Sequence, residues 1–73
     1  MIRNRLEYAV LIYKTVVHDA EEWCKERWGE RWSVNSNRSG VWACFWAGNS
    51  NPGYYRFMFA NEVDMILFAL RWS

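Results

Sequence analysis

The sequence is poor in the residues on which most catalytic and metal-binding sites depend. It has one histidine, two cysteines and one proline, and the two cysteines form no Cys-x-x-Cys pair. Because a structural zinc site takes four such ligands, we expect no metal ion, and nothing in the sequence indicates another cofactor. His18, beside Asp19, is expected at the end of a strand or the entry of a helix. Cys24 lies on the apolar stripe of a predicted helix, and Cys44 lies between two Trp with no evident base to activate it. The sequence therefore predicts a protein that is not an enzyme.

The sequence also lacks an excess of charge of one sign and any long apolar run. Nine Lys and Arg residues against eight Asp and Glu residues give a net charge of +1. This balance disfavours a groove that follows a nucleic-acid backbone. No stretch approaches the roughly 20 apolar residues of a membrane span. Lys14 ends the first apolar run, and no small-residue cleavage site follows it. We therefore expect a cytoplasmic protein with no membrane partner.

Aromatic residues are abundant instead. The 73 residues include six Trp, four Tyr and four Phe. Each large ring removes about 150–250 Å² from water when it is buried, which offsets the small size of the chain. We expect a single domain over residues 1–73, with Cys24 and Cys44 as free thiols in its core.

The first half of the sequence predicts a strand followed by a helix. Residues Tyr8–Val17 are mostly β-branched, aromatic or leucine, which favours a strand that ends near Val17. An amphipathic helix over residues 5–17 is the alternative. The strand is favoured because Asp19 has the spacing of a helix N-cap with an acid three residues on. A helix over Ala20–Trp28 then follows, and Gly29 ends it.

The second half predicts three strands and a final helix. Trp32–Asn35 is expected to be a short strand, Val41–Ala47 the clearest strand, and Tyr54–Phe59 its returning partner. Asn61 is expected to cap the final helix, which is apolar almost all round and should therefore be deeply packed. The predicted fold is α+β, a small antiparallel sheet in the order β-α-β-β-β-α with two helices on one face. If the first segment is a helix, the order is α-β-β-β-α.

The candidate site follows from the alternation of side chains along the last two strands. We expect Phe57 and Phe59 to share the helix-covered face with Ala43 and Phe45. The opposite face then carries the candidate partner-binding residues, which are Trp42, Trp46, Tyr54, Arg56 and Met58.

An open face of this kind predicts binding. Two Trp rings and one Tyr ring present on the order of 500 Å², more than soluble monomers usually leave uncovered. Trp, Tyr, Arg and Met are also enriched in protein interfaces. We therefore expect a protein partner. One alternative is a homo-oligomer, most simply a homodimer, that uses the same face. Another is a nucleotide or single-stranded nucleic acid held by stacking and by Arg31, Arg38 and Arg56.

The chain also resembles small uncharacterised bacteriophage proteins. Their C-terminal pattern, a Phe, then an Asp five residues on, then Phe-x-Leu-Arg-Trp, is matched by Phe59, Asp64, Phe68, Leu70, Arg71 and Trp72. Residues Asp19 to Cys24, with Gly29 and Trp32, are similar to their middle region. The resemblance implies a phage-type inhibitor that binds a host or antiviral-defence protein in the host-cell cytoplasm.

Overall fold

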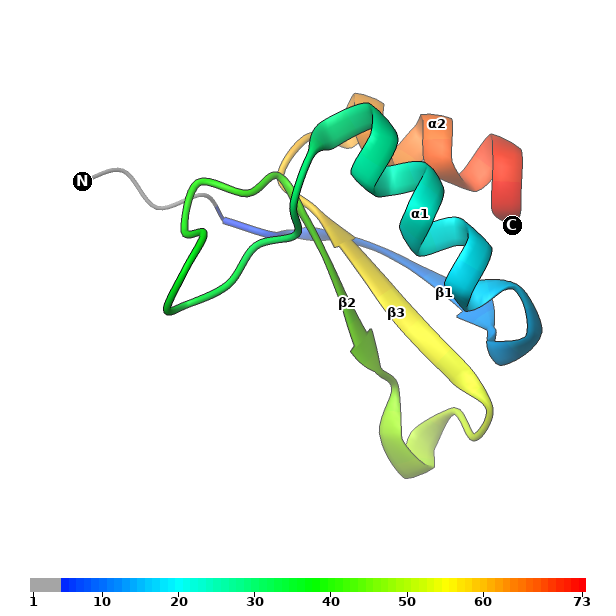
Figure 1. Cartoon of the computed structure of the whole chain (residues 1–73). Coiled ribbons are helices and arrows are strands. Elements are labelled where there is room, and N and C mark those ends of the chain that lie inside the picture. The colour runs from blue at the N-terminus through cyan, green and yellow to red at the C-terminus, as the bar shows by residue number, and fades with distance from the viewer. Residues whose placement is uncertain (1–4) are drawn as a thin grey trace.

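Three antiparallel strands form a sheet, and two helices cover one of its faces in the computed structural model (Figure 1). The model describes residues 5–73. The elements are β1 (Tyr8–Tyr13), η1 (Lys14–Val16), α1 (Val17–Trp28), β2 (Trp42–Trp46), η2 (Gly48–Ser50), β3 (Tyr54–Phe59) and α2 (Glu62–Trp72). The predicted α+β class, the antiparallel sheet and the helices packed on it are confirmed. The alternative in which the first segment is a helix is wrong.

The sheet has the order β1-β3-β2, so the last strand in sequence lies at its centre. Phe59 of β3 stands between Tyr8 of β1 and Trp42 of β2, and Phe57 stands between Val10 and Cys44. Residues directly opposite one another share a face of the sheet. This register therefore decides which side chains meet the helices.

The core lies between the sheet and the helices, and it is largely aromatic. Phe68 of α2 lies 4.6 Å from Phe57 and 5.1 Å from Phe59, between ring centroids. Trp42 stacks on Phe57 at 6.3 Å, and Trp72 returns to the core 6.3 Å from Trp23 of α1. The buried cluster comprises Ile12, Val17, Ala20, Cys24, Trp42, Phe57, Phe59 and Phe68.

Helix α1 begins earlier than the sequence indicated. Strand β1 ends at Tyr13 and not near Val17, and the turn η1 carries the chain directly into α1. The N-cap is Val16, and it makes no side-chain capping hydrogen bond. Burial of Val17 against the core compensates for the missing cap. Asp19, the predicted N-cap, lies in the first turn, where its carboxylate favours the positive end of the helix dipole.

The predicted strand Trp32–Asn35 is wrong. This segment is a turn closed by one isolated bridge between Ser33 and Asn37. The Ser33 hydroxyl accepts bonds from the backbone N–H groups of Asn35 and Ser36, each at 3.4 Å. Such local bonds give the backbone an alternative to a strand ladder.

Helix α2 is much less buried than expected. Its N-cap is Asn61, as predicted, although the Asn61 side chain accepts no capping bond from a backbone N–H. Its amide instead donates to the Asp64 carboxylate (3.2 Å). Phe68 is the one fully buried residue of the helix. A single sheet covers only one side of a helix, so the apolar residues on the other side stay in water. They are Val63, Ile66, Leu67 and Leu70.

Candidate interaction face

The sheet face that points away from the helices, which we call the open face, carries side chains from all three strands. Both helices lie on the other side of the sheet (Figure 1). By the strand register, the open face consists of Ala9, Leu11, Tyr13, Ala43, Phe45, Tyr54, Arg56 and Met58. Ala43 is the exception to its openness, since it is only 1% exposed.

Arg56 lies at the centre of the open face. It stands between Leu11 of β1 and Phe45 of β2, with Tyr54 and Met58 on either side of it along β3. None of the eight residues of the open face is acidic. Among the ion pairs formed within residues 5–73, none includes Arg56. The open face therefore presents one positive charge surrounded by apolar and aromatic side chains.

The side chains on the open face around Arg56 are accessible to a partner. Tyr13 and Tyr54 meet edge to face with their ring centroids 5.3 Å apart. Between 39% and 48% of the surface remains accessible in Leu11, Tyr13, Phe45 and Tyr54. Large aromatic side chains that remain about half exposed on a sheet face are typical of recognition surfaces.

Three of the predicted site residues lie together on this face, namely Tyr54, Arg56 and Met58. Trp42 does not, which corrects the predicted grouping. Trp42 is only 1% exposed, and its indole N–H donates to the carbonyl of Gly29 at 2.8 Å. Alternation along β2 was predicted correctly, but the face assigned to each set was reversed. The helix-facing positions opposite Phe57 and Phe59 are Cys44 and Trp42, and not Ala43 and Phe45.

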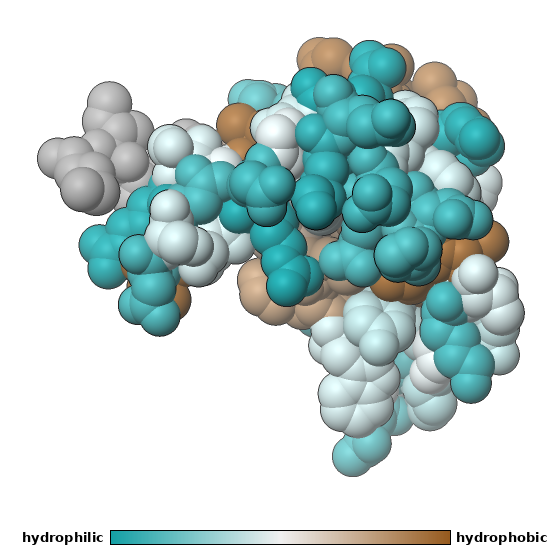
Figure 2. Space-filling view, viewed as in Figure 1, coloured by the Kyte–Doolittle hydropathy of each residue, from teal (hydrophilic) through white to brown (hydrophobic). Residues whose placement is uncertain are grey.

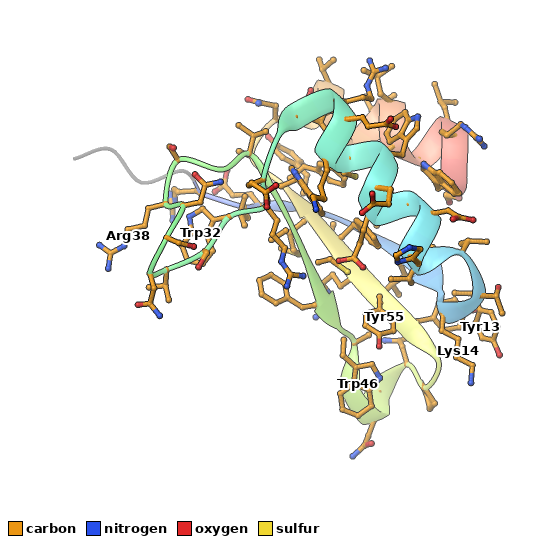
Figure 3. The ribbon with its side chains drawn as sticks, in the orientation of Figure 1. Tyr13, Lys14, Trp32, Arg38, Trp46 and Tyr55 are labelled. Carbon is orange, nitrogen blue, oxygen red and sulfur yellow. The ribbon has the colours of Figure 1, made fainter. Side chains whose placement is uncertain are left out.

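Trp46 lies apart from the open face as well. It shares the helix-facing side of β2 with Trp42, but it is 60% exposed. Its partner in the register is Tyr55, and the two rings lie at the end of the sheet that extends beyond α1 (Figure 3).

Sequence reasoning missed Leu11, Tyr13 and Phe45. Strand β2 carries two apolar sets of side chains, one with Trp42 and one with Phe45, and the position of Phe45 depends on which set faces the helices. The small residues Ala20 and Cys24 on the buried side of α1 leave space for a large ring from the sheet, and Trp42 fills the core there. Leu11 and Tyr13 alternate with the buried Ile12, and that pattern could have placed them on the outer face once β1 was accepted as a strand.

The two thiols are poorly suited to nucleophilic chemistry. Both are free, Cys24 being fully buried and Cys44 half-buried. Burial, followed by the neighbouring Cys44, raises the pKa of Cys24 to about 12. Burial, followed by the Glu21 carboxylate, likewise raises the pKa of Cys44 to about 12. The reactive thiolate is therefore scarce at neutral pH.

The three arginines considered for nucleotide binding have different surroundings. Arg31 pairs with Glu21 at 3.3 Å, Arg38 donates to the carbonyl of Val34 at 2.7 Å, and Arg56 lies on the open face. Within residues 5–73, no group of three or more His, Cys, Asp and Glu side chains is placed to hold a metal ion. In the same part of the chain, no helix has the length and apolar character that crossing a membrane requires.

Comparisons of the chain with protein-family models, with curated proteins and with solved structures gave no match. The site is therefore interpreted from its own geometry.

Proposed function

We propose that the chain is a non-enzymatic binding protein whose open face takes a protein partner. The observation that carries this proposal is the position of Arg56, which forms no ion pair within residues 5–73 and lies at the centre of an apolar and aromatic face. Binding energy in protein interfaces concentrates in central Arg, Tyr and Trp residues that surrounding contacts shield from water. Leu11, Phe45, Tyr54 and Met58 are positioned to provide that shield.

The chemistry of the open face defines what the partner presents. A partner carboxylate would pair with the Arg56 guanidinium through two parallel hydrogen bonds. Apolar side chains around that carboxylate would pack on Leu11 and Phe45 and exclude water from the ion pair. The phage resemblance adds the class of partner, a host or antiviral-defence protein of the bacterial cytoplasm.

The other two uses of this face are supported less well. A face-to-face homodimer would bring the central guanidinium of one copy close to that of the other, and two like charges in a desolvated interface repel. A strand of nucleic acid requires several cations along its backbone, whereas the open face offers Arg56 alone among its eight residues.

A charge-reversal comparison tests the proposal. Tagged wild-type protein and the variant Arg56→Glu would be used to capture partners from a lysate of bacteria. Arg38→Glu is the matched control, since it makes the same charge change in the segment between α1 and β2. We expect a protein that wild type and Arg38→Glu retain in equal amounts and that Arg56→Glu loses at least tenfold, because a buried ion pair becomes a repulsion.

A second pair of variants tests the apolar side chains that surround Arg56. Phe45→Glu and Val34→Glu change side chains of nearly equal exposure, 48% and 47%. Loss of the captured protein with Phe45→Glu but not with Val34→Glu supports the proposal. Equal retention by Arg56→Glu and Phe45→Glu, both shown to be folded by circular dichroism, would exclude the open face as the binding surface.

A further inference from the structure

The outer edge of β1 exposes backbone groups that no strand of the sheet pairs. Within residues 5–73, β1 has a neighbouring strand on one side only, and that strand is β3. In an antiparallel pair, every second residue of a strand bonds to the neighbouring strand through its backbone N–H and C=O. Lys14 N–H bonds to the Gly53 carbonyl (2.8 Å), so the residues of β1 that bond to β3 are Tyr8, Val10 and Ile12. The N–H and C=O groups of the intervening residues point the other way. These residues are Ala9, Leu11 and Tyr13.

This edge lacks the features that usually prevent strand addition. Residues Tyr8–Tyr13 read YAVLIY and contain no charged residue and no proline. The other edge of the sheet is different, because Trp32 N–H bonds to the carbonyl of Trp42 at 2.7 Å and brings the segment before β2 alongside its first residue.

A second unpartnered surface lies on α2. Val63, Ile66, Leu67 and Leu70 have the spacing of one helical stripe, and Leu70 is 80% exposed. The stripe lies on the side of α2 opposite the buried Phe68. Figure 2 shows hydrophobic atoms gathered over this helix. Helix α2 packs on β1 and β3, and its Trp72 meets Trp23 of α1. Leu67 lies on the other flank of the helix, away from α1 and towards the free edge, and the stripe extends from this flank over the outer side of α2.

We propose that two copies of the chain pair antiparallel through β1, about a two-fold axis that passes midway between the two Leu11 residues. Leu11 then faces Leu11 of the second copy, and Ala9 faces its Tyr13. This register satisfies all the outward N–H and C=O groups of the three residues and gives six backbone hydrogen bonds. The result is a continuous six-stranded sheet.

The same axis accounts for the stripe on α2. Strands in a sheet are about 4.8 Å apart, so helices that each lie over β1 and β3 would be on the order of 10 Å from one another across the axis. That separation is close to the 8–10 Å of packed helices. The two α2 helices would run antiparallel, and their apolar stripes would shield one another from water.

Charge favours a second copy of this chain as the occupant. Helix α2 carries Glu62 and Asp64 in its first turn and Arg71 in its last turn. Antiparallel packing brings the acidic end of one helix to the basic end of the other. Likewise, the antiparallel β1 strands bring Glu7 of one copy towards Lys14 of the other. The stripe contributes roughly 300 Å² of apolar surface per copy, taking about 30 Å² per methylene. Together with the strand edge, this indicates a dimer of modest affinity.

Sedimentation equilibrium between about 1 and 300 μM tests the assembly, and we expect wild type to shift from monomer to dimer in this range. Leu11→Pro removes an N–H that the monomer leaves unpaired, a position where an edge strand tolerates proline. Leu70→Glu places a charge in the helix contact. Each variant should raise the dissociation constant at least tenfold. Phe45→Glu, on the far strand of the open face, should leave it within about twofold, so failure of this inference and failure of the proposed function are distinguishable.

A cross-link tests the register. Hydrogen-bonded residues facing one another in antiparallel strands have their Cα atoms about 5.5 Å apart, within the range of a disulfide. With oxidised glutathione, two Leu11→Cys chains should lose two thiol protons and two electrons to form one intermolecular disulfide, releasing two molecules of reduced glutathione. Phe45→Cys is the matched exposed control and should cross-link at least tenfold more slowly. The native thiols, Cys24 buried and Cys44 half-buried, react slowly because burial raises the pKa of each to about 12.

Three results would overturn the inference. The first is a monomer at every concentration. The second is a dimer that Leu11→Pro and Leu70→Glu leave unchanged. The third is equal cross-linking of the two cysteine variants. Circular dichroism of each variant shows whether it is folded, and if Leu11→Pro does not fold, Leu70→Glu and the cross-link still decide.

Discussion

Trp42 and Trp46 leave the same side of β2 four residues apart and enter opposite environments. Trp42 lies beneath α1, stacks on Phe57 and donates its indole N–H to Gly29, whereas Trp46 lies beyond the end of that helix. Alternation along the predicted strand placed both of these large apolar residues on one face. The extent of α1 over that face is a tertiary property, which no local pattern contains.

Alanine substitution should separate the two tryptophans. Trp42→Ala removes a fully buried ring and should lower the free energy of unfolding by about 3–5 kcal/mol. Trp46→Ala should lower it by less than about 1 kcal/mol, because that ring remains largely in water. Urea titrations followed by far-ultraviolet circular dichroism give both values. Equal losses would contradict the burial described for these side chains.

The thiols make stability depend on pH in alkaline solution. The pKa of Cys24 and that of Cys44 are each raised from 9.0 to about 12, because burial disfavours the thiolate. Between these pH values the unfolded chain loses thiol protons that the folded chain keeps. The contribution is therefore complete below pH 9 and declines as the pH rises towards 12. Urea titrations of wild type and of a Cys24→Ala/Cys44→Ala variant from pH 8 to 10.5, under reducing conditions, should show a steeper loss for wild type. Parallel slopes would mean that the thiols do not contribute.

At the scale of elements, the sequence predicted β2, β3 and both helices because each has a strong local signal, and it favoured a strand for β1 over the helical alternative. Strand β3 starts and ends as expected, and α2 follows Asn61. The failures occurred where side chains compete with backbone patterns. Ser33 bonds to the backbone of the two residues that a strand would have extended, and the apolar sequence of α2 exceeds what one sheet can cover. Apolar content alone does not distinguish a buried helix from one with an exposed apolar side.

The turn between β2 and β3 offers a matched test of backbone geometry. Gly48 and Gly53 both have a positive φ, 78° and 82°. A Cβ on Gly48 would meet nothing within 4 Å, whereas one on Gly53 would lie 3.0 Å from Cε1 of Tyr13. Both alanine variants should lose about 1 kcal/mol of stability to the left-handed backbone. Gly53→Ala should lose up to about 1 kcal/mol more, since the Tyr13 ring must shift.

Thermal or urea unfolding of the two glycine variants measures this difference. Identical values would show that Tyr13 moves aside without cost. A smaller loss for Gly53→Ala would contradict the contact.

For the whole molecule, the register of the central strand decided how much of the site could be predicted. Tyr54, Arg56 and Met58 were grouped correctly because alternation within β3 suffices to group them. Their neighbours Leu11 and Phe45 come from strands that are distant in sequence, so pairing had to be known first. A shift of one residue between β2 and β3 exchanges the buried and the outer set of side chains, and both sets of β2 are apolar.

The shared aromatic core predicts that the molecule unfolds in one step. Phe68 of α2 contacts both Phe57 and Phe59, and Trp23 of α1 contacts Phe68, so neither helix has a core of its own. Tryptophan fluorescence and far-ultraviolet circular dichroism should therefore report the same urea midpoint. Two separate midpoints would contradict the single domain expected from the sequence.

The order β1-β3-β2 has a consequence for the newly made chain. Of the three strands described in the sheet of one chain, β1 is synthesised before the others and has β3, the last, as its one neighbour; the 40 residues from Lys14 to Gly53 separate the two. At translation rates of about 5–20 residues per second, β1 waits roughly 2–8 s for β3. During that time the apolar segment YAVLIY has neither of its edges paired within the sheet. We expect folding in the cell to begin with β2 and β3, which are close in sequence, and β1 to be the part of the nascent chain most in need of chaperone protection.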